Sequence, residues 1–361
     1  MTNRDRSAAP HLRAIGPAYV HRVRGAGPLA QICGTAEGSR SRRFWHFGGL
    51  VFPDFAPAEK HHLQLIHSDR HIGRIAETAD RGFVSLDPDT GASSRSYDAA
   101  RLAVGAVIAG TDLIMAGEVD NVFALVRPPG HHAEPDRPMG FCLFNNIAIA
   151  AAYATRGLGL KRVMIVDWDL HHGNGTQHAF YESEEVLYFS SHLYPYFPGS
   201  GALQETGSGG GEGYTVNIPL SGGQNDMSYA AIFNDIVTPL ARQYKPEMIM
   251  VSAGYDICVG DPLGAMAVTP AGFAYLTELL KDLAAELCSG RLLLTLEGGY
   301  NLTGLRDGVL ATIGALADNS LLPDQAVETG PLRKAAFGRP GCLSGDAFDV
   351  IRKGHGKHWQ F

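Results

Sequence analysis

The chain has 361 residues, of which 45% are hydrophobic and 19% are charged, and its formal net charge is -7. This composition is typical of a globular protein with a full-sized core. The negative charge argues against broad contact with phosphate backbones, so we expect no direct nucleic acid binding. No apolar run approaches the roughly 18 residues of a spanning helix. The five scattered cysteines lack CxxC spacing, and we therefore expect a cytoplasmic protein with no membrane contact and no disulfide scaffold.

The first 60 residues have the least regular pattern. Arg-rich and Gly-rich pieces alternate there with the aromatic stretch FWHFGGLVFPDFAP, and we expect loops with short helices. From about residue 95 the pattern becomes regular. The segment SYDAARLAVGAVIAGTDLIMAG has apolar residues at helical spacing and ends on Gly117, a residue type favoured directly after helices.

Short β-rich runs then alternate with helical stretches. The helical stretches cover 145–157, 227–244 and 270–290. The six β-rich runs are 122–126, 162–167, 186–191, 214–220, 248–254 and 291–299. Several runs are apolar on both faces, as in a parallel sheet covered by helices on both sides. The alternation predicts a single α/β domain.

Polar clusters follow four of these runs. They are RPPGHH, DWDLHHGNG, YDICVGDPLG and EGGYN. In open α/β sheets, ligands bind in the crevice outside the carboxyl ends of the strands. All four loops can face one such crevice, which makes it the expected place for chemistry.

Asp169 and His171 are the strongest candidates for metal ligands. They lie two positions apart on an extended segment, so their side chains point to the same face. Asp256, at the end of an apolar run, is the best third ligand. Two carboxylates and one imidazole with an open position are typical of a catalytic zinc site, although Fe²⁺ or Co²⁺ would also suit this set. The alternative is a hydrogen-bonded turn without a metal.

His131 and His132 follow the Pro-Pro-Gly turn of RPPGHH. An imidazole with a pKa near neutrality can take a proton from a water and return it to a leaving amine, so these two are the candidate acid/base pair. Asp167 can orient one of them. Tyr300 follows two glycines and can donate a hydrogen bond to a developing oxyanion. Each of these motifs also has a commoner alternative when it is taken alone. Two adjacent histidines usually lie in a solvated loop, and a tyrosine at the end of a strand usually packs against its neighbours.

The motifs RPPGHHAE, MGFCLFNN, DWDLHHGNGTQ, FPGSGA, SAGYDICVGDPLG and LEGGYNL together resemble the class II branch of the histone deacetylase superfamily, which includes the acetylpolyamine amidohydrolases. The resemblance covers residues 80–316. It implies an arginase-deacetylase-like fold with a central parallel β-sheet flanked by helices. The family's opening loop has only faint counterparts here. We therefore expect a divergent region at 1–60 that shapes the entrance, followed by a deacetylase catalytic domain at 61–361.

The resemblance also implies roles for individual residues. Asp169, His171 and Asp256 match the zinc ligands, and His132 matches the general base and acid. His131 matches its electrostatic partner, and Tyr300 matches the oxyanion donor. The remaining matches are the rim aspartate Asp89, the acyl-tunnel walls Gly140, Phe141 and Phe197, the mouth residue Leu263, and an inner potassium site made by Asp167, Asp169, His171, Ser190 and Ser191. Asn174 stands where the class I branch has an aspartate beside the catalytic histidine.

The reaction implied is metal-dependent hydrolysis of N6-acetyl-lysine, or another acyl-lysine, in peptides or proteins, with release of acetate. An amidohydrolase for acetylpolyamines or other small N-acyl amines is the alternative within the enzymes. A binding or scaffold protein that has lost catalysis is the non-enzymatic alternative, and the filled catalytic positions argue against it. An arginase-like hydrolase would need further carboxylates beside His171. Leu263 makes one point of the rim apolar, which favours lysine over a polyamine. A homo-oligomer is compatible with the sequence.

Overall fold

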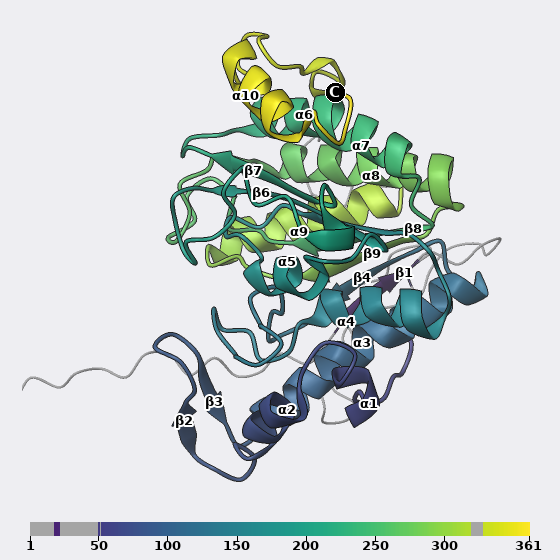
Figure 1. Ribbon diagram of the computed structural model, residues 1–361, viewed down its shortest axis with the longest axis vertical. Coiled ribbons are helices and arrows are strands. Elements are labelled where there is room, and N and C mark those ends of the chain that lie inside the picture. Colours follow the sequence, from purple (N-terminus) through teal and green to yellow (C-terminus); the bar gives the residue numbers. More distant parts are fainter. Residues whose placement is uncertain (1–17, 22–49, 51, 319–327) are drawn as a thin grey trace, which may run out of the picture.

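The computed structural model describes residues 18–21, 50, 52–318 and 328–361. Most of the region 1–60 lies outside the described residues, so its role at the entrance and the boundary at residue 60 stay predictions. A seven-stranded sheet runs through the molecule in the order β1-β4-β9-β8-β5-β6-β7 (Figure 1). Its strands from β4 to β7 in that order are parallel, and β1 pairs antiparallel with β4 at one edge.

All six predicted strands are present. Their bounds are Asn121–Leu125 (β4), Val163–Asp167 (β5), Val186–Leu193 (β6), Thr215–Leu220 (β7), Met248–Ala253 (β8) and Leu292–Leu296 (β9). The strand β1, Ala18–His21, falls where only loops and short helices were expected. A second, two-stranded sheet pairs Phe83–Ser85 (β2) with Gly91–Ser93 (β3).

Both faces of the main sheet are buried because its strands are apolar at consecutive positions. In β5, Met164 and Val166 join the core on one face, while Val163 and Ile165 join the core on the other. Helices α3 (Ser96–Ala116) and α4 (Asn146–Ala152) cover the second face. The first face is covered by α6 (Asp226–Ile232), α7 (Thr238–Tyr244), α8 (Pro270–Cys288) and α9 (Leu302–Leu316), and Figure 1 shows these two layers on opposite sides of the sheet. The fold is the predicted α/β architecture.

The helices include every predicted one and several that were not predicted. Their bounds are Lys60–Leu63 (α1), Asp69–Ala76 (α2), Ser96–Ala116 (α3), Asn146–Ala152 (α4), Asn174–Phe180 (α5), Asp226–Ile232 (α6), Thr238–Tyr244 (α7), Pro270–Cys288 (α8), Leu302–Leu316 (α9) and Gly345–His355 (α10). The predicted helix at 227–244 is α6 and α7 joined by a π-helical turn, Phe233–Val237. Gly117 caps α3 in the left-handed conformation with φ of 70°, as predicted.

One helix within the described residues, α3, is long and apolar enough to cross a membrane by length and composition. The prediction that no segment reaches that threshold is therefore wrong. Gly105, Gly110, Thr111 and Asp112 interrupt its apolar runs, but the many alanines and aliphatic residues keep its mean hydropathy high. Many of its residues, from Ala100 to Ile114, are buried in the fold, where the helix packs on α4 and on β4.

Candidate active site

Three ligand-type side chains meet at the carboxyl ends of β5 and β8. The possible ligand atoms of Asp169, His171 and Asp256 lie within 4.8 Å of one another, and all three residues are buried. The Nδ1 atom of His171 lies 3.0 Å from Asp256 Oδ2 and 3.2 Å from Asp169 Oδ1. The structure thus brings together the three residues that the sequence suggested as metal ligands.

Backbone amides fix the two carboxylates. The Leu170 N–H donates to Asp256 Oδ1 at 2.9 Å, and the Gly298 N–H donates to Asp169 Oδ2 at 2.8 Å. Gly298 has to be a glycine here, because a Cβ on it would lie 2.3 Å from Asp256 Oδ2. The backbone at residue 298 therefore lies too close to the ligand group for a side chain at this position.

The electrostatics of this group favour a cation. Burial alone would lower the pKa of His171, but Asp169 and Asp256 raise it to about 11. Burial and the neighbouring Asp169 carboxylate raise the pKa of Asp256 to about 6. Two buried carboxylates around one imidazole are stabilised by added positive charge, and mixed oxygen and nitrogen donors suit Zn²⁺, Fe²⁺ or Co²⁺. The residues present therefore fit a divalent metal ion.

His131 and His132 are adjacent, with ring centroids 4.0 Å apart, yet their surroundings differ. His131 Nδ1 lies 3.1 Å from Asp167 Oδ2, and its Nε2 lies 3.8 Å from Asp169 Oδ1. Burial opposes its charge, but Asp169, Asp167 and Glu297 raise its pKa to about 10. For His132, burial and the charges of His131 and His171 hold the pKa well below its ordinary value. One ring is thus set up to be charged and the other to be neutral.

Glu297 is a buried carboxylate in the motif LEGGYNL that was not predicted as a site residue. Its Oε2 accepts hydrogen bonds from the N–H groups of Gly130 and His131, at 2.7 and 3.1 Å. Its Oε1 accepts from the Ser252 hydroxyl at 3.1 Å. Burial raises its pKa to about 7. Glu297 therefore fastens the loop that carries the two histidines to β9.

Tyr300 lies close enough to the ligand group for the charges of Asp256 and Asp169 to act on its phenol. Burial and the charges of Asp256 and Asp169 hold the pKa of its phenol above the ordinary value, so the hydroxyl stays protonated. Its N–H donates to Asp261 Oδ2 at 2.7 Å. Its ring meets Phe141 edge-on, with centroids 6.1 Å apart.

Three of the residues expected to form the tunnel, Gly140, Phe141 and Phe197, lie against His132, Tyr300 or His171. The Phe197 ring lies edge-on to His132 with centroids 5.1 Å apart. Phe141, Phe197 and Leu263 keep 42%, 37% and 40% of their surface exposed, which places them at a mouth rather than in the core. A Cβ on Gly140 would lie 2.3 Å from the His132 ring. Tyr196 was not predicted; its ring stacks on His171 at 5.6 Å and its hydroxyl donates to the Leu263 carbonyl at 3.2 Å.

Asp89 lies in the turn between β2 and β3 and contacts the tunnel wall directly. Its Oδ1 accepts from the Gly140 N–H at 3.0 Å and from the Thr90 hydroxyl at 2.7 Å. The Phe141 N–H donates to Thr90 Oγ1 at 3.1 Å. The hairpin thus holds the wall in place, and the role of Asp89 toward substrate amides stays a prediction.

The residues suggested for potassium also lie together. Asp167 and Ser190 are partners in the register of β5 and β6. Asp167 Oδ1 accepts from the Asp169 N–H at 3.1 Å, and Ser190 Oγ lies 2.9 Å from His192 Nδ1. The hydroxyl of Ser191 is buried and has no hydrogen-bond partner within the described part of the chain.

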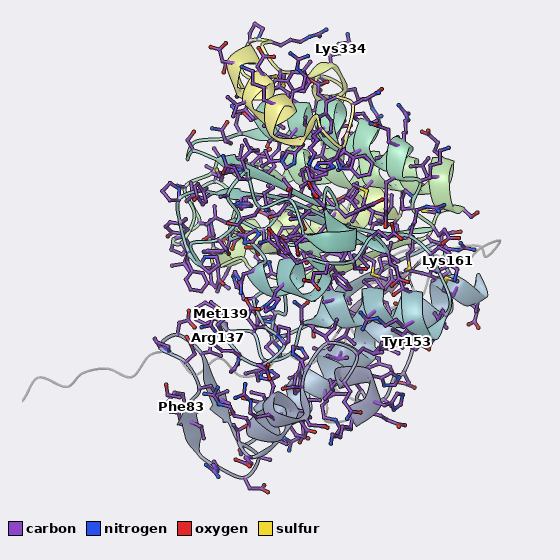
Figure 2. The ribbon with its side chains drawn as sticks, in the orientation of Figure 1. Phe83, Arg137, Met139, Tyr153, Lys161 and Lys334 are labelled. Atoms are coloured by element: carbon purple, nitrogen blue, oxygen red, sulfur yellow. The ribbon has the colours of Figure 1, made fainter. Side chains whose placement is uncertain are left out.

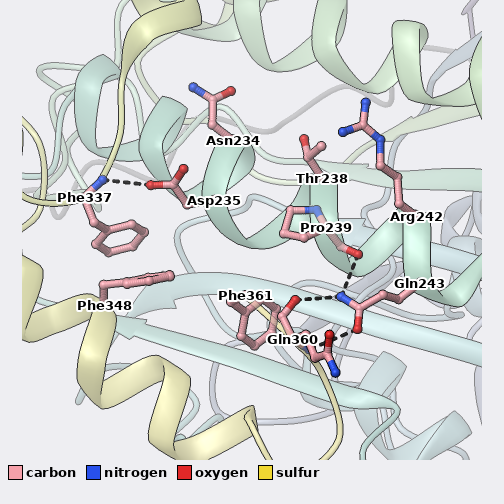
Figure 3. Close-up of a pocket in the computed structure, with 10 residues that line it drawn as sticks. All are labelled: Asn234, Asp235, Thr238, Pro239, Arg242, Gln243, Phe337, Phe348, Gln360 and Phe361. Atoms are coloured by element: carbon pink, nitrogen blue, oxygen red, sulfur yellow. Dashed lines mark hydrogen bonds between the residues drawn. The ribbon is translucent and has the colours of Figure 1, made fainter.

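A separate hollow of about 690 Å³ lies between α7 and the C-terminal segment (Figure 3). Its polar groups are already engaged. The Phe337 N–H donates to Asp235 Oδ2 at 2.9 Å, and Gln243 pairs with the backbone of Gln360. Arg242 is paired with Glu286 at 2.9 Å. No group of metal ligands lines it, so the candidate active site is the one at the strand ends.

The fold and the site together define an α/β protein with a candidate metal centre at the carboxyl ends of its parallel strands. The profile of the histone deacetylase domain matches residues 37–316. A solved structure, "Crystal Structure of HDA15 HD domain", matches with a TM-score of 0.75 and 39% identity, covering 85% of this chain and 81% of that one. The chain belongs to the histone deacetylase family, and the resemblance seen in its motifs is confirmed.

Curated relatives from several organisms carry the family name. The chain is 44% identical to "Histone deacetylase 15" of Arabidopsis thaliana, covering 75% of this chain and 49% of that protein. It is 42% identical to "Histone deacetylase 10, chloroplastic" of Oryza sativa subsp. japonica, covering 74% and 62%. It is 40% identical to "Histone deacetylase HDA1" of Candida albicans, covering 77% and 34%. The chain thus spans between 34% and 62% of the length of these three relatives.

Proposed function

We propose that this protein is a zinc-dependent hydrolase that removes the acetyl group from N6-acetyl-lysine in peptides or proteins. The observation that carries the proposal is the buried group of Asp169, His171 and Asp256, with a neutral His132 beside it and Tyr300 close to it. The names of the relatives support the deacetylase activity, and the donor set supports the metal.

A zinc ion held by these three residues would supply a Lewis acid for the amide carbonyl and lower the pKa of the attacking water. His132 takes the proton of that water as its oxygen bonds to the carbonyl carbon. The Tyr300 hydroxyl donates a hydrogen bond to the oxyanion that forms, an interaction worth on the order of 3 kcal/mol. His132 then gives its proton to the nitrogen as the C–N bond breaks, which releases acetate and a free amine.

The mouth favours a lysine side chain over a polyamine. Phe141 and Phe197 offer apolar walls to the lysine methylenes, with a stabilisation of about 0.8 kcal/mol for each CH₂ buried. Leu263 at the mouth gives no carboxylate for a second ammonium group. The deciding measurement is kcat/KM for an acetyl-lysine peptide against N-acetylputrescine and N8-acetylspermidine. A tenfold preference for the polyamines would make the chain an acetylpolyamine amidohydrolase, and no turnover of any of them would favour a binding protein.

Two further proposals concern the surroundings of the site. The buried, unpartnered hydroxyl of Ser191, the residue after Ser190, which pairs with Asp167 in the sheet, supports a structural K⁺ ion at the residues named above. A higher melting temperature in potassium salt than in lithium salt would support it. A cytoplasmic location is supported by the cysteines within the described residues, Cys142, Cys258, Cys288 and Cys342, which are all free. Imaging of the tagged chain in cells tests the location, and sedimentation tests whether it forms a homo-oligomer.

A further inference from the structure

A chain of polar contacts leads from His132 to the protein surface. His132 Nδ1 lies 2.8 Å from Asn174 Oδ1. Asn174 Nδ2 donates to Glu134 Oε1 at 2.5 Å, and Glu134 Oε2 lies 2.5 Å from His178 Nδ1. His132 and Asn174 are buried, the Glu134 side chain is 17% exposed, and that of His178 is 66% exposed. Glu134 thus lies between a buried pair and solvent.

The orientation of the Asn174 amide decides which nitrogen of His132 carries the proton. An asparagine side chain has an accepting oxygen and a donating NH₂ of similar size, so its neighbours determine which way it points. If Asn174 Oδ1 faces His132, the ring must donate from Nδ1, and Nε2 is left free to accept a proton. The reversed amide would favour the opposite tautomer, in which Nε2 already holds a proton.

Every group that faces Asn174 Nδ2 is an acceptor. Besides Glu134, these are the His132 carbonyl at 3.3 Å and the Met139 sulfur at 3.3 Å. The sulfur also accepts from Arg137 Nη2 at 3.1 Å, and Figure 2 shows Arg137 and Met139 close together on this loop. Of the three acceptors only Glu134 is a carboxylate, whose hydrogen bonds are the strongest.

Glu134 is itself held in place from two elements. Its N–H donates to the Arg137 carbonyl at 2.9 Å, and its own carbonyl lies 3.0 Å from His67 Nδ1. Asn174 and His178 lie one turn apart on α5, so a single carboxylate reaches both. The side chain is therefore directed at Asn174 by a fixed backbone on one side and by His178 on the other.

We propose that Glu134 is a positioning residue, which fixes the amide of Asn174 and thereby the tautomer of His132 in which Nε2 can accept a proton. The catalytic consequence rests on the proposed function, whereas the tautomer is a property of the resting protein. The two can therefore fail separately.

The first test reads the tautomer without turnover. The side-chain nitrogens of ¹⁵N-histidine-labelled, zinc-loaded protein are recorded by NMR, and the His132 signals are assigned with a His132→Gln variant. In the natural chain His132 should carry its proton on Nδ1. Glu134→Ala should give a mixture of tautomers, and an unchanged Nδ1-protonated ring in that variant would overturn the proposal. Asp226→Ala is the matched control, because this partly buried carboxylate accepts from Thr269 N–H at 2.7 Å, and His132 should keep its tautomer there.

The second test exchanges the amide of Asn174 and the carboxylate of Glu134 between the two positions. Glu134→Ala should lower kcat about tenfold with KM unchanged, which is the expected cost of losing one orienting hydrogen bond. Asn174→Asp alone should be at least as damaging, because two carboxylates would then face each other. Combining Asn174→Asp with Glu134→Gln restores one donor and one acceptor, and we expect kcat to return to within about threefold of the natural chain.

The outcome separates positioning from general support of the fold. A double variant no more active than Asn174→Asp alone would contradict the proposal, as would a Glu134→Ala variant that keeps full kcat. A merely structural role predicts that both losses persist together, with lower melting temperatures that follow the activity. If the natural chain hydrolyses no acyl amine, the proposed function fails, and the NMR measurement alone decides the role of Glu134.

Discussion

Two groups of buried histidines in this molecule have opposite electrostatics. His67 precedes α2 and His71 belongs to it; their ring centroids are 4.8 Å apart, and both rings lie next to Phe144. Burial lowers the pKa of both, to about 3 for His67. At the strand ends, His131 and His171 are equally enclosed, yet the surrounding carboxylates raise their pKa values to about 10 and about 11.

The difference shows what makes a buried histidine part of a charged site. Both rings of the first pair face backbone groups: His67 Nδ1 lies 3.0 Å from the Glu134 carbonyl, and His71 Nε2 lies 2.7 Å from the Leu143 carbonyl. A backbone carbonyl accepts the N–H of a neutral ring, and such contacts stabilise the fold without a charge on the histidine. The strand-end pair faces ionised carboxylates instead, so of these two pairs it is the one whose surroundings stabilise added positive charge.

The largest expected effect comes from removing one of those carboxylates. Asp256→Ala leaves His171 with a single acidic neighbour, so we expect near-stoichiometric zinc in the natural chain and almost none in the variant. Deacetylase activity should fall roughly a thousandfold, about 4 kcal/mol of transition-state stabilisation. Metal analysis of the purified proteins is the measurement, with Asp226→Ala as the remote control. Unchanged metal content in Asp256→Ala would remove this residue from the site.

Tyr300 should have the next largest effect, because burial and the same carboxylates raise the pKa of its phenol and keep it protonated and able to donate. Tyr300→Phe should lower kcat by roughly a hundredfold or more and leave KM nearly unchanged, since the lost hydrogen bond forms to the developing oxyanion. Steady-state kinetics on an acetyl-lysine peptide, with the metal content verified, measure this. A variant that keeps most of its kcat would assign the oxyanion to another donor.

His67 tests the other side of the comparison. Its pKa is lowered in the folded protein, so the unfolded chain binds the proton more readily and stability falls as the pH drops from about 6.5 toward 3. At pH 5 this costs about 2 kcal/mol relative to pH 7. His67→Gln removes that cost.

Denaturant unfolding at pH 7 and pH 5 measures the loss of stability that His67 causes. The stability loss between the two pH values should be about 2 kcal/mol smaller in His67→Gln than in the natural chain. His61→Gln is the matched control, since this neighbouring histidine has a 64% exposed side chain. Equal losses in the His67 and His61 variants would show that burial of His67 is not the cause.

The sequence alone predicted the elements and side chains whose local pattern is distinctive. The strands were predictable because parallel strands buried on both faces leave apolar runs, and the ligand group was predictable because polar motifs follow those runs. Asp261 and Glu134 were not identified, because each acts through hydrogen bonds to residues distant in sequence, such as Asp261 with Tyr300. The helix α9 was missed because its glycines weaken the helical pattern. The strand β1 was missed because four residues give too short a pattern.

The smallest expected effect comes from adding a charge at the mouth, where position 263 is an apolar leucine. Leu263→Glu would place an acidic group near Tyr196, whose hydroxyl donates to the Leu263 carbonyl at 3.2 Å. That carboxylate would attract a ligand ammonium group, as the strand-end carboxylates attract charge on their histidines. Because this point is 40% exposed, solvent screening limits the gain to about 1 kcal/mol. The ratio of kcat/KM for N8-acetylspermidine to that for an acetyl-lysine peptide should therefore rise about fivefold, while Leu263→Gln, which matches the size without the charge, should leave the ratio unchanged. An equal rise in both variants would mean that polarity or shape, and not charge, governs selection at this mouth.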